Sequence, residues 1–106
     1  MRVLVVEDDP DQRALLVLIV RQHGHVAVAC ASLSEARAAP PCDLALVDRR
    51  LPDGDGLAFA SAWPGRAVVL TGEERDDAHA GVELLVKPVR PAVLARLLDG
   101  PDPSRA

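Results

Sequence analysis

Five short apolar runs recur along the chain, and they constrain the fold more than any other feature of the sequence. They are VLVV (3–6), VAVA (26–29), LALV (44–47), AVVL (67–70) and LLV (84–86). None of them alternates cleanly between apolar and polar residues. Continuous apolar runs of this length are typical of strands that are covered on both faces, as in a parallel sheet. We therefore expect five strands, each buried on both sides.

Helix start and stop signals lie between the apolar runs. Asp9 can cap a first helix that begins at Pro10 and ends at Gly24. The segment SLSE (32–35) has the pattern of a capping box, and Pro40-Pro41 stop the helix that it opens. Further helices are expected at 56–63, within 73–80 and from 91 to about 100, of which the first two are short.

The alternation of strands and helices predicts an α/β fold built around a doubly wound parallel sheet. The 106 residues are enough for one domain, and we place it at 1–99. The segment GPDPSRA (100–106) is rich in proline and polar residues, which predicts a disordered tail. No internal repeat and no second domain is expected.

Charge and composition exclude several classes of function. The net charge of −4 argues against nucleic-acid binding, which needs a basic surface. The apolar runs are too short for a signal peptide or a membrane span. Cys30 and Cys42 have no metal-binding spacing, so we expect two small buried residues in a reducing cytoplasm. The histidines are expected to face solvent, and they are His23, His25 and His79.

Polar side chains stand where four of the five strands end. Glu7, Asp8 and Asp9 follow the first strand, and Asp48 ends the third. The fourth strand ends in a hydroxyl and the fifth in an amine, from Thr71 and Lys87. In a doubly wound sheet, ligands bind at the carboxyl ends of the strands. Each residue alone is more often structural than functional, but together they predict one site.

The chemistry of this residue set is that of a phosphoryl acceptor. Carboxylates that lie close together repel one another, and a divalent cation relieves that repulsion. Mg²⁺ takes one or two carboxylates, with water and phosphate oxygens completing its shell. A neighbouring aspartate can attack a phosphoryl group. Positive charge on the phosphoryl oxygens then assists the transfer, and Lys87 can contribute to it.

Four motifs, in order along the chain, resemble the receiver domain of two-component response regulators. They are VLVVEDDP (3–10), LALVDRRLPDGDGL (44–57), VVLTG (68–72) and LLVKPV (84–89). The resemblance covers about residues 2–98. It implies the flavodoxin-like strand order 2-1-3-4-5 in a (βα)₅ fold, with the third and fourth helices shorter than is usual in the family.

The resemblance also implies a phosphoacceptor and a metal site. Asp48 matches the phosphoacceptor, and Glu7 with Asp8 matches the acidic pair. Asp8 and Asp48 are the expected carboxylate ligands of Mg²⁺ or Mn²⁺, and Glu7 binds through water. The backbone carbonyl of Arg50 matches the remaining protein ligand, whereas Asp9 is expected only to cap a helix. The partner that donates the phosphoryl group is a histidine kinase or a histidine phosphotransfer protein.

Further positions match the part of the family that responds to phosphorylation. Thr71 matches the switch hydroxyl and Lys87 the lysine, and the bond from Lys87 to Pro88 is a candidate cis peptide bond. Two positions depart from the family. Leu84 stands where a switch aromatic is usual, and Arg49 stands where an apolar residue is usual. We also expect the polar segment 72–81 to be mobile.

The first helix carries apolar residues on two sides. At 100° per residue, one side holds Leu15, Leu16, Ile19 and His23, and the other holds Ala14, Val17, Leu18 and Arg21. We expect the first group to face the sheet. The outer apolar residues, Ala14, Val17 and Leu18, then indicate a docking surface for a kinase, a phosphotransfer domain or a second copy in a homodimer. Alternatively, they are scattered apolar surface residues.

Three other functions compete with the phosphoacceptor. PDGDG (52–56) suggests calcium, but Leu57 stands where an EF-hand needs a ligand, so a turn is expected instead. A phosphorylation-independent interaction or dimerisation module would keep the fold and use the first helix. A hydrolase with an aspartate nucleophile would need an acid where Arg50 stands. We therefore expect no enzyme beyond the chain's own phosphoryl transfer and dephosphorylation.

Overall fold

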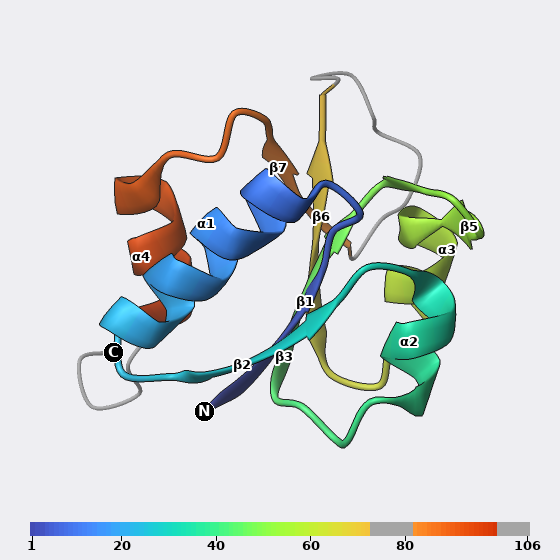
Figure 1. The fold of residues 1–106 in the computed structure, drawn as a ribbon, viewed down its shortest axis with the longest axis horizontal. Helices are drawn as coiled ribbons and strands as arrows, with labels where there is room; N and C mark the ends of the chain where they lie inside the picture. The colour runs from blue at the N-terminus through green and yellow to red at the C-terminus, as the bar shows by residue number, and fades with distance from the viewer. Residues whose placement is uncertain (73–81, 100–106) are drawn as a thin grey trace.

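The chain folds around a parallel sheet, seen in a computed structural model that describes residues 1–72 and 82–99 (Figure 1). The long strands are β1 (Arg2–Val6), β2 (Val26–Cys30), β3 (Leu44–Asp48), β6 (Arg66–Thr71) and β7 (Glu83–Val86). Within the described residues they form a sheet of five strands in the order β2-β1-β3-β6-β7, with every neighbouring pair parallel. Counted by long strands alone this is 2-1-3-4-5, so the predicted fold class and strand order are confirmed.

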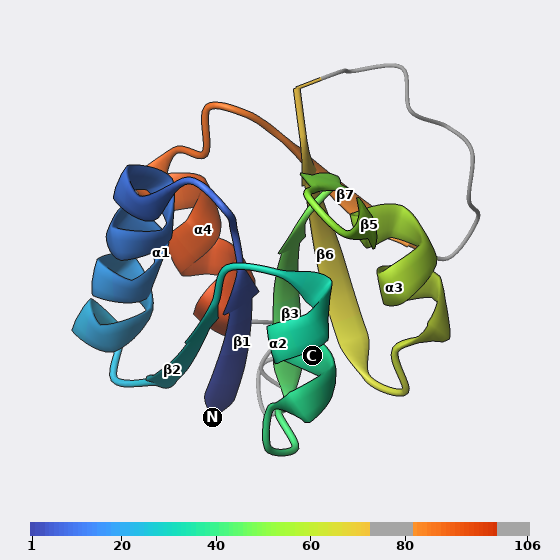
Figure 2. The ribbon, with the colours of Figure 1, turned by 45° about the vertical axis from the view of Figure 1, so that its right-hand side comes forward.

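The helices cover the sheet from both sides. Helices α1 (Pro10–Gln22) and α4 (Pro91–Asp99) lie on one face, and α2 (Leu33–Ala38) with α3 (Gly56–Ala62) lies on the other (Figure 2). Two apolar clusters result, one on each face of the sheet. The predicted short helix at 56–63 is confirmed. The helix expected within 73–80, the mobility expected of 72–81 beyond Gly72, and the tail at 100–106 lie outside the described residues.

Burial differs between the central and the edge strands. The apolar residues of β1 and β3, together with most of β6, are almost fully buried. By contrast, Val26 in β2 is 60% exposed and Val86 in β7 is 39% exposed. The expectation that all five strands are buried on both faces is therefore wrong for β2 and β7. An edge strand has a neighbour on one side only, and the helices pack mainly over the middle of the sheet.

The predicted helix caps are confirmed. The Asp9 carboxylate accepts hydrogen bonds from the backbone N–H groups of Asp11 and Gln12 at the start of α1, with Pro10 in the first position. Ser32 caps α2 by accepting from the N–H of Glu35, whose carboxylate accepts in turn from Ala31. Gly24 follows α1 with a φ of 80°, a conformation that favours glycine.

A small hairpin that the sequence did not predict follows β3. Strands β4 (Arg50–Leu51) and β5 (Gly54–Asp55) pair antiparallel. At the tip of the hairpin, Asp53 accepts hydrogen bonds of 2.9 Å from the backbone N–H groups of both Leu33 and Ser34 at the start of α2. These two bonds lower the pKa of the Asp53 carboxyl. The segment PDGDG therefore forms a turn, as expected, and its Asp53 binds the backbone at the start of α2.

The cysteines and histidines differ in part from expectation. Both cysteines are free; Cys30 is buried as predicted, but Cys42 is only half-buried. Burial raises the pKa of both thiols. His23 is exposed, whereas His25 is half-buried, and its Nδ1 lies 3.0 Å from the amino nitrogen of Met1. His79 lies outside the described residues. Within residues 1–72 and 82–99, no helix has both the length and the apolar character needed to cross a bilayer.

Candidate functional site

The carboxyl edge of the sheet gathers the acids, the hydroxyl and the amine that the sequence placed at strand ends. Glu7 directly follows β1, and Asp48 is the last residue of β3. Thr71 ends β6, and Lys87 directly follows β7. Three of these side chains lie inside the protein, since Glu7 is 1% exposed, Asp48 8% and Thr71 3%. A buried polar group needs a partner or a ligand, so this edge is the candidate site.

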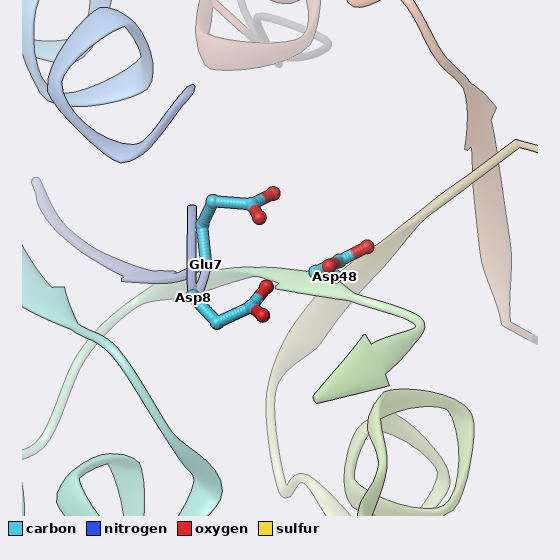
Figure 3. Close-up of side chains that lie close together, drawn as sticks. All are labelled: Glu7, Asp8 and Asp48. Carbon is cyan, nitrogen blue, oxygen red and sulfur yellow. The ribbon is translucent and has the colours of Figure 1, made fainter. Parts of the chain in front are cut away.

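Three carboxylates converge at this edge. Glu7 and Asp8 come from the end of β1 and Asp48 comes from β3 (Figure 3). One oxygen from each of the three lies within 4.8 Å of the others. Glu7 and Asp48 are buried and Asp8 is exposed. Oxygen ligands at this spacing fit a hard divalent cation such as Mg²⁺ or Mn²⁺, and the exposure of Asp8 leaves the cluster open to solvent.

The Lys87 ammonium bridges two of these acids. Its Nζ lies 3.1 Å from Glu7 Oε2 and 3.0 Å from Asp48 Oδ1. Burial alone would lower the pKa of Lys87, but the hydrogen bonds and the negative charges of Asp48 and Glu7 outweigh burial and raise it. Lys87 therefore stays charged. Burial raises the pKa of the Glu7 carboxyl, and bonds from the Asp9 N–H and from Lys87 oppose that rise.

Backbone hydrogen bonds fix the residues on either side of the site. The Lys87 N–H donates to the Thr71 carbonyl at 2.7 Å, which extends the parallel ladder in which Val86 pairs with Thr71. The Arg49 N–H donates to the Leu70 carbonyl at 2.8 Å, directly beyond the pair of Asp48 and Leu70. The peptide bond between Lys87 and Pro88 is cis. The site thus stands on strand ends rather than on long loops.

Gly56 allows α3 to approach the end of β3 closely. A Cβ atom at this position would overlap the backbone carbonyl oxygen of Asp48 and would lie 2.9 Å from Val47 Cγ1. The Gly56 N–H donates to the Arg49 carbonyl at 2.7 Å. The missing side chain therefore lets the helix and the strand that carries Asp48 pack backbone against backbone.

A hollow of about 380 Å³ opens beside Asp48, lined by Asp48, Arg49, Arg50, Thr71, Gly72 and Lys87. Arg50 begins β4 and is exposed. Arg49 is half-buried, with its Nε 3.9 Å from Asp55 Oδ1. The hollow is bordered by one acid and three basic residues, which suits a ligand that carries negative charge.

One supporting contact was missed by the sequence reasoning. The Arg13 guanidinium donates from Nη1 to the backbone carbonyl of Glu7 at 2.9 Å. Arg13 lies four residues after the helix cap Asp9, one turn into α1, and this spacing was the only signal for it in the sequence. The contact ties the loop that carries Glu7 and Asp8 to the helix behind it.

The predicted orientation of α1 is wrong in part. The residues of α1 that are buried against the sheet are Leu16, Ile19 and Val20. Leu15 was expected to face the sheet but is 48% exposed, and Leu18 is 52% exposed. His23, placed on the same side as Leu15, is exposed. Residues 14–20 are all apolar, so their periodicity does not determine which side is buried.

The outer apolar surface of α1 consequently differs from the predicted one. Val17 is half-buried and packs against the apolar cluster under α1 and α4. Ala14 and Leu18 are exposed as expected, and Leu15 joins them. We call Ala14, Leu15 and Leu18 the α1 surface. A hollow of about 430 Å³ adjoins it, and its lining includes Leu15, Lys87, Pro88 and Val89.

Leu84, at the position where a switch aromatic was expected, is half-buried in β7. It packs against the apolar cluster under α2 and α3. In the sheet it pairs with Val69, two residues before Thr71. A leucine at this position fills space at the edge of the sheet and offers no hydroxyl.

Comparison with known proteins identifies the class of this fold. No family model matches the chain. Transcriptional regulatory protein AruR of Pseudomonas aeruginosa is 31% identical over an alignment that covers 88% of this chain and 46% of AruR. The chain thus spans about half the length of the curated relative that it matches.

Solved structures of response regulators superpose on most of the chain. A CheY-like response regulator receiver domain from Methylobacillus flagellatus superposes with a TM-score of 0.83 and is 25% identical, covering 93% of this chain and 96% of that one. Response regulator protein TrrA of Thermotoga maritima, in complex with Mg²⁺-BeF, has a TM-score of 0.76 and 26% identity, covering 88% and 91%. The resemblance seen in the sequence is confirmed: the chain has the CheY-like receiver fold of two-component response regulators.

Proposed function

We propose that this chain is a phosphoacceptor in two-component signalling, taking a phosphoryl group from a histidine kinase or a histidine phosphotransfer protein onto Asp48. The observation that carries the proposal is the position of Asp48. Its carboxylate borders an open hollow, lies 3.0 Å from the Lys87 ammonium and stands beside two further acids. A nucleophilic carboxylate with cationic and hydrogen-bonding neighbours is what phosphoryl transfer to an aspartate requires.

In the proposed transfer, an Asp48 carboxylate oxygen forms a bond to the phosphorus of the partner's phosphohistidine. The phosphorus–nitrogen bond breaks, and the imidazole leaves with the electron pair and takes up a proton. Lys87 neutralises negative charge on the phosphoryl oxygens, and the Thr71 hydroxyl donates a hydrogen bond to one of them. Because Lys87 also pairs with Glu7, the new charge on Asp48 redistributes its contacts. Such a redistribution can switch a partner-binding face.

The acid cluster is proposed to hold Mg²⁺, or Mn²⁺ in its place. Asp8 and Asp48 would bind the ion directly, Glu7 through water, and Arg50 through its backbone carbonyl. When bound, the ion supplies positive charge for the transferred phosphoryl group. The proximity of the three carboxylates supports this assignment, as does the similarity to TrrA, whose structure is a complex with Mg²⁺-BeF. A cytoplasmic location belongs to the same proposal.

Replacing Asp48 by Asn is expected to abolish phosphorylation. The wild-type chain, incubated with acetyl phosphate and Mg²⁺, should gain one phosphoryl group, measured as the mass of the intact protein. Asp48→Asn should gain none, because an amide is not a nucleophile for this transfer. Chelating the Mg²⁺ should also suppress the gain. Equal incorporation by wild type and variant would contradict the assignment of Asp48.

The α1 surface favours a second candidate function, an interaction module that works without phosphorylation. Leu15 and Leu18 are both about half exposed, and large apolar side chains are usually covered in a complex. The α1 surface lies close to the acid cluster, since the hollow next to Leu15 is also lined by Lys87. Under the phosphoacceptor function, we propose that the occupant of the α1 surface is the phosphodonor, with a homodimer as the alternative occupant.

Charging the α1 surface tests the docking proposal. Leu15→Glu with Leu18→Glu should slow phosphoryl transfer from a phosphorylated kinase or phosphotransfer domain by about tenfold or more, because buried apolar anchors dominate such interfaces. The donor is the kinase or phosphotransfer domain that transfers its phosphoryl group fastest to the wild type, selected from a panel. Transfer from acetyl phosphate should not change. Val26→Glu, which charges an apolar residue on β2 that is at least as exposed, is the control.

The outcomes separate the two functions. Equal transfer to the double variant and to the wild type would contradict docking at α1. Binding of the kinase or phosphotransfer domain to the wild type is also measured with and without beryllofluoride and Mg²⁺, which mimic the phosphoryl group. Equal affinity under the two conditions would favour the phosphorylation-independent module. A change in sedimentation of the double variant alone would identify a homodimer as the occupant.

A further inference from the structure

Arg13 contacts three successive carbonyls of the loop that carries two of the three acids. From the first turns of α1, its Nη1 donates to the backbone carbonyl oxygen of Glu7 at 2.9 Å and to that of Asp8 at 3.4 Å. Its own backbone N–H donates to the carbonyl oxygen of Asp9 at 2.9 Å. A single residue of the helix therefore fixes the stretch of backbone on which the acid pair stands.

These bonds from the Arg13 guanidinium go to carbonyl oxygens, so they do not occupy the carboxylates of Glu7 and Asp8. Both carboxylates lie on the side of Asp48 (Figure 3), and one oxygen of each acid is within 4.8 Å of the others. A guanidinium bound to either carboxylate would compete with a cation for the same oxygens. Bound to the carbonyls, it orients the acid pair and leaves the oxygens that could ligate a metal to the cluster.

The two acids of the loop differ in how much other support they have. The Glu7 N–H donates to the Cys30 carbonyl at 3.0 Å, and the buried Glu7 carboxylate pairs with Lys87 at 3.1 Å. Asp8 is exposed, and within the part of the chain that the structure describes its hydrogen bond is the one from Arg13. Loss of Arg13 should therefore affect mainly the orientation of Asp8, one of the two proposed direct carboxylate ligands.

We propose that Arg13 is a positioning residue of the acid cluster and sets its preference for Mg²⁺ over Ca²⁺; this inference rests on the proposed function. Mg²⁺ requires nearly ideal octahedral geometry, whereas Ca²⁺ accepts more oxygen ligands in flexible arrangements. Ligands on a fixed backbone therefore favour Mg²⁺, and ligands on a loose loop tolerate Ca²⁺. Arg13 acts through the backbone of Glu7 and Asp8, as residues behind a metal site commonly do by orienting the ligands.

Calorimetric titration with Mg²⁺ and, separately, with Ca²⁺ tests this inference. Arg13→Met should weaken Mg²⁺ binding about tenfold, as expected when a residue that orients a metal ligand is lost. Ca²⁺ binding should weaken only about two- to threefold, so the ratio of the two affinities should fall. Arg13→Lys should recover part of the Mg²⁺ affinity, because an ammonium can still donate to a carbonyl. The matched control is Arg21→Met, an exposed arginine in the last turn of the same helix, which should bind both ions as the wild type does.

The ratio of affinities separates positioning from other effects of the substitution. Loss of a positive charge would strengthen the binding of both cations, and a destabilised fold would weaken the binding of both alike. Each variant is titrated well below its own unfolding temperature. An unchanged ratio in Arg13→Met, or the same change in Arg21→Met, would overturn the inference.

One further variant locates the titrated ion. Asp8→Asn should abolish Mg²⁺ binding if the ion occupies the acid cluster. When Asp8→Asn loses the ion but Arg13→Met binds both ions as the wild type does, the inference fails and the proposed function stands. If the wild type binds no Mg²⁺, or Asp8→Asn binds it equally well, the proposed metal site fails together with the inference.

Discussion

Replacing Gly56 by Ala is expected to lower the free energy of unfolding by about 3 kcal/mol, a large effect for one methyl group. The added Cβ would overlap the carbonyl oxygen of Asp48 and press on the side chain of Val47. Neither neighbour can move easily, since both belong to the buried strand β3. The substitution must therefore push α3 away from the strand, break the bond from Gly56 to Arg49 and displace Asp48. Chemical denaturation measures the change.

Gly72→Ala is the matched control. No described atom lies within 4 Å of a Cβ at position 72, and its φ is not in the left-handed region. The free energy of unfolding should stay within about 0.5 kcal/mol of the wild type. If the two alanine variants are equally stable, α3 does not approach β3 as closely as described, and the account of how Asp48 is positioned is wrong.

Replacing Lys87 by Met is expected to cost about 3 kcal/mol of stability in metal-free buffer. The ammonium pairs with both Glu7 and Asp48, at 3.1 and 3.0 Å, and both of these acids are buried. Without it, Glu7 remains inside the protein with no cation, and removing one partner of a buried pair is strongly destabilising. Methionine has an apolar side chain similar to the methylene chain of lysine. The loss of stability therefore measures the effect of removing the charge.

Two further variants show whether burial is the cause. Arg66 binds Glu83 through two hydrogen bonds, of 2.7 and 2.9 Å, but the two side chains are 38% and 48% exposed. Arg66→Met should therefore cost at most about 1 kcal/mol. Adding Glu7→Gln to Lys87→Met should recover most of the loss, because the unpaired charge is removed. A larger loss in Arg66→Met, or no recovery in the double variant, would contradict this account of the site.

The fold was predictable because local signals and tertiary structure agree. The apolar runs marked all five long strands, and the caps at Asp9 and Ser32 marked two helix starts. The burial of the edge strands was not predictable in the same way. β2 is as apolar in sequence as β3, and only its place in the sheet leaves Val26 exposed.

The candidate site was predictable where it depends on strand ends. Glu7, Asp48, Thr71 and Lys87 each adjoin a strand end, and the parallel sheet brings those ends together. Contacts made across loops carried no such signal. The bonds from Asp53 to the start of α2 and from Arg13 to the Glu7 carbonyl join residues whose approach depends on how the loops fold. Which side of α1 is buried was also undetermined, because Leu15 and Leu16 are equally apolar.

Locating the phosphoryl group tests the central claim most directly. Borohydride reduces an aspartyl phosphate to homoserine, which peptide mass spectrometry can assign to one position. After reaction of the wild-type chain with acetyl phosphate and Mg²⁺, we predict this conversion at position 48 and nowhere else. Conversion at Asp8 or at another carboxylate, or no conversion in a chain that is otherwise folded, would contradict the proposal that Asp48 accepts the phosphoryl group.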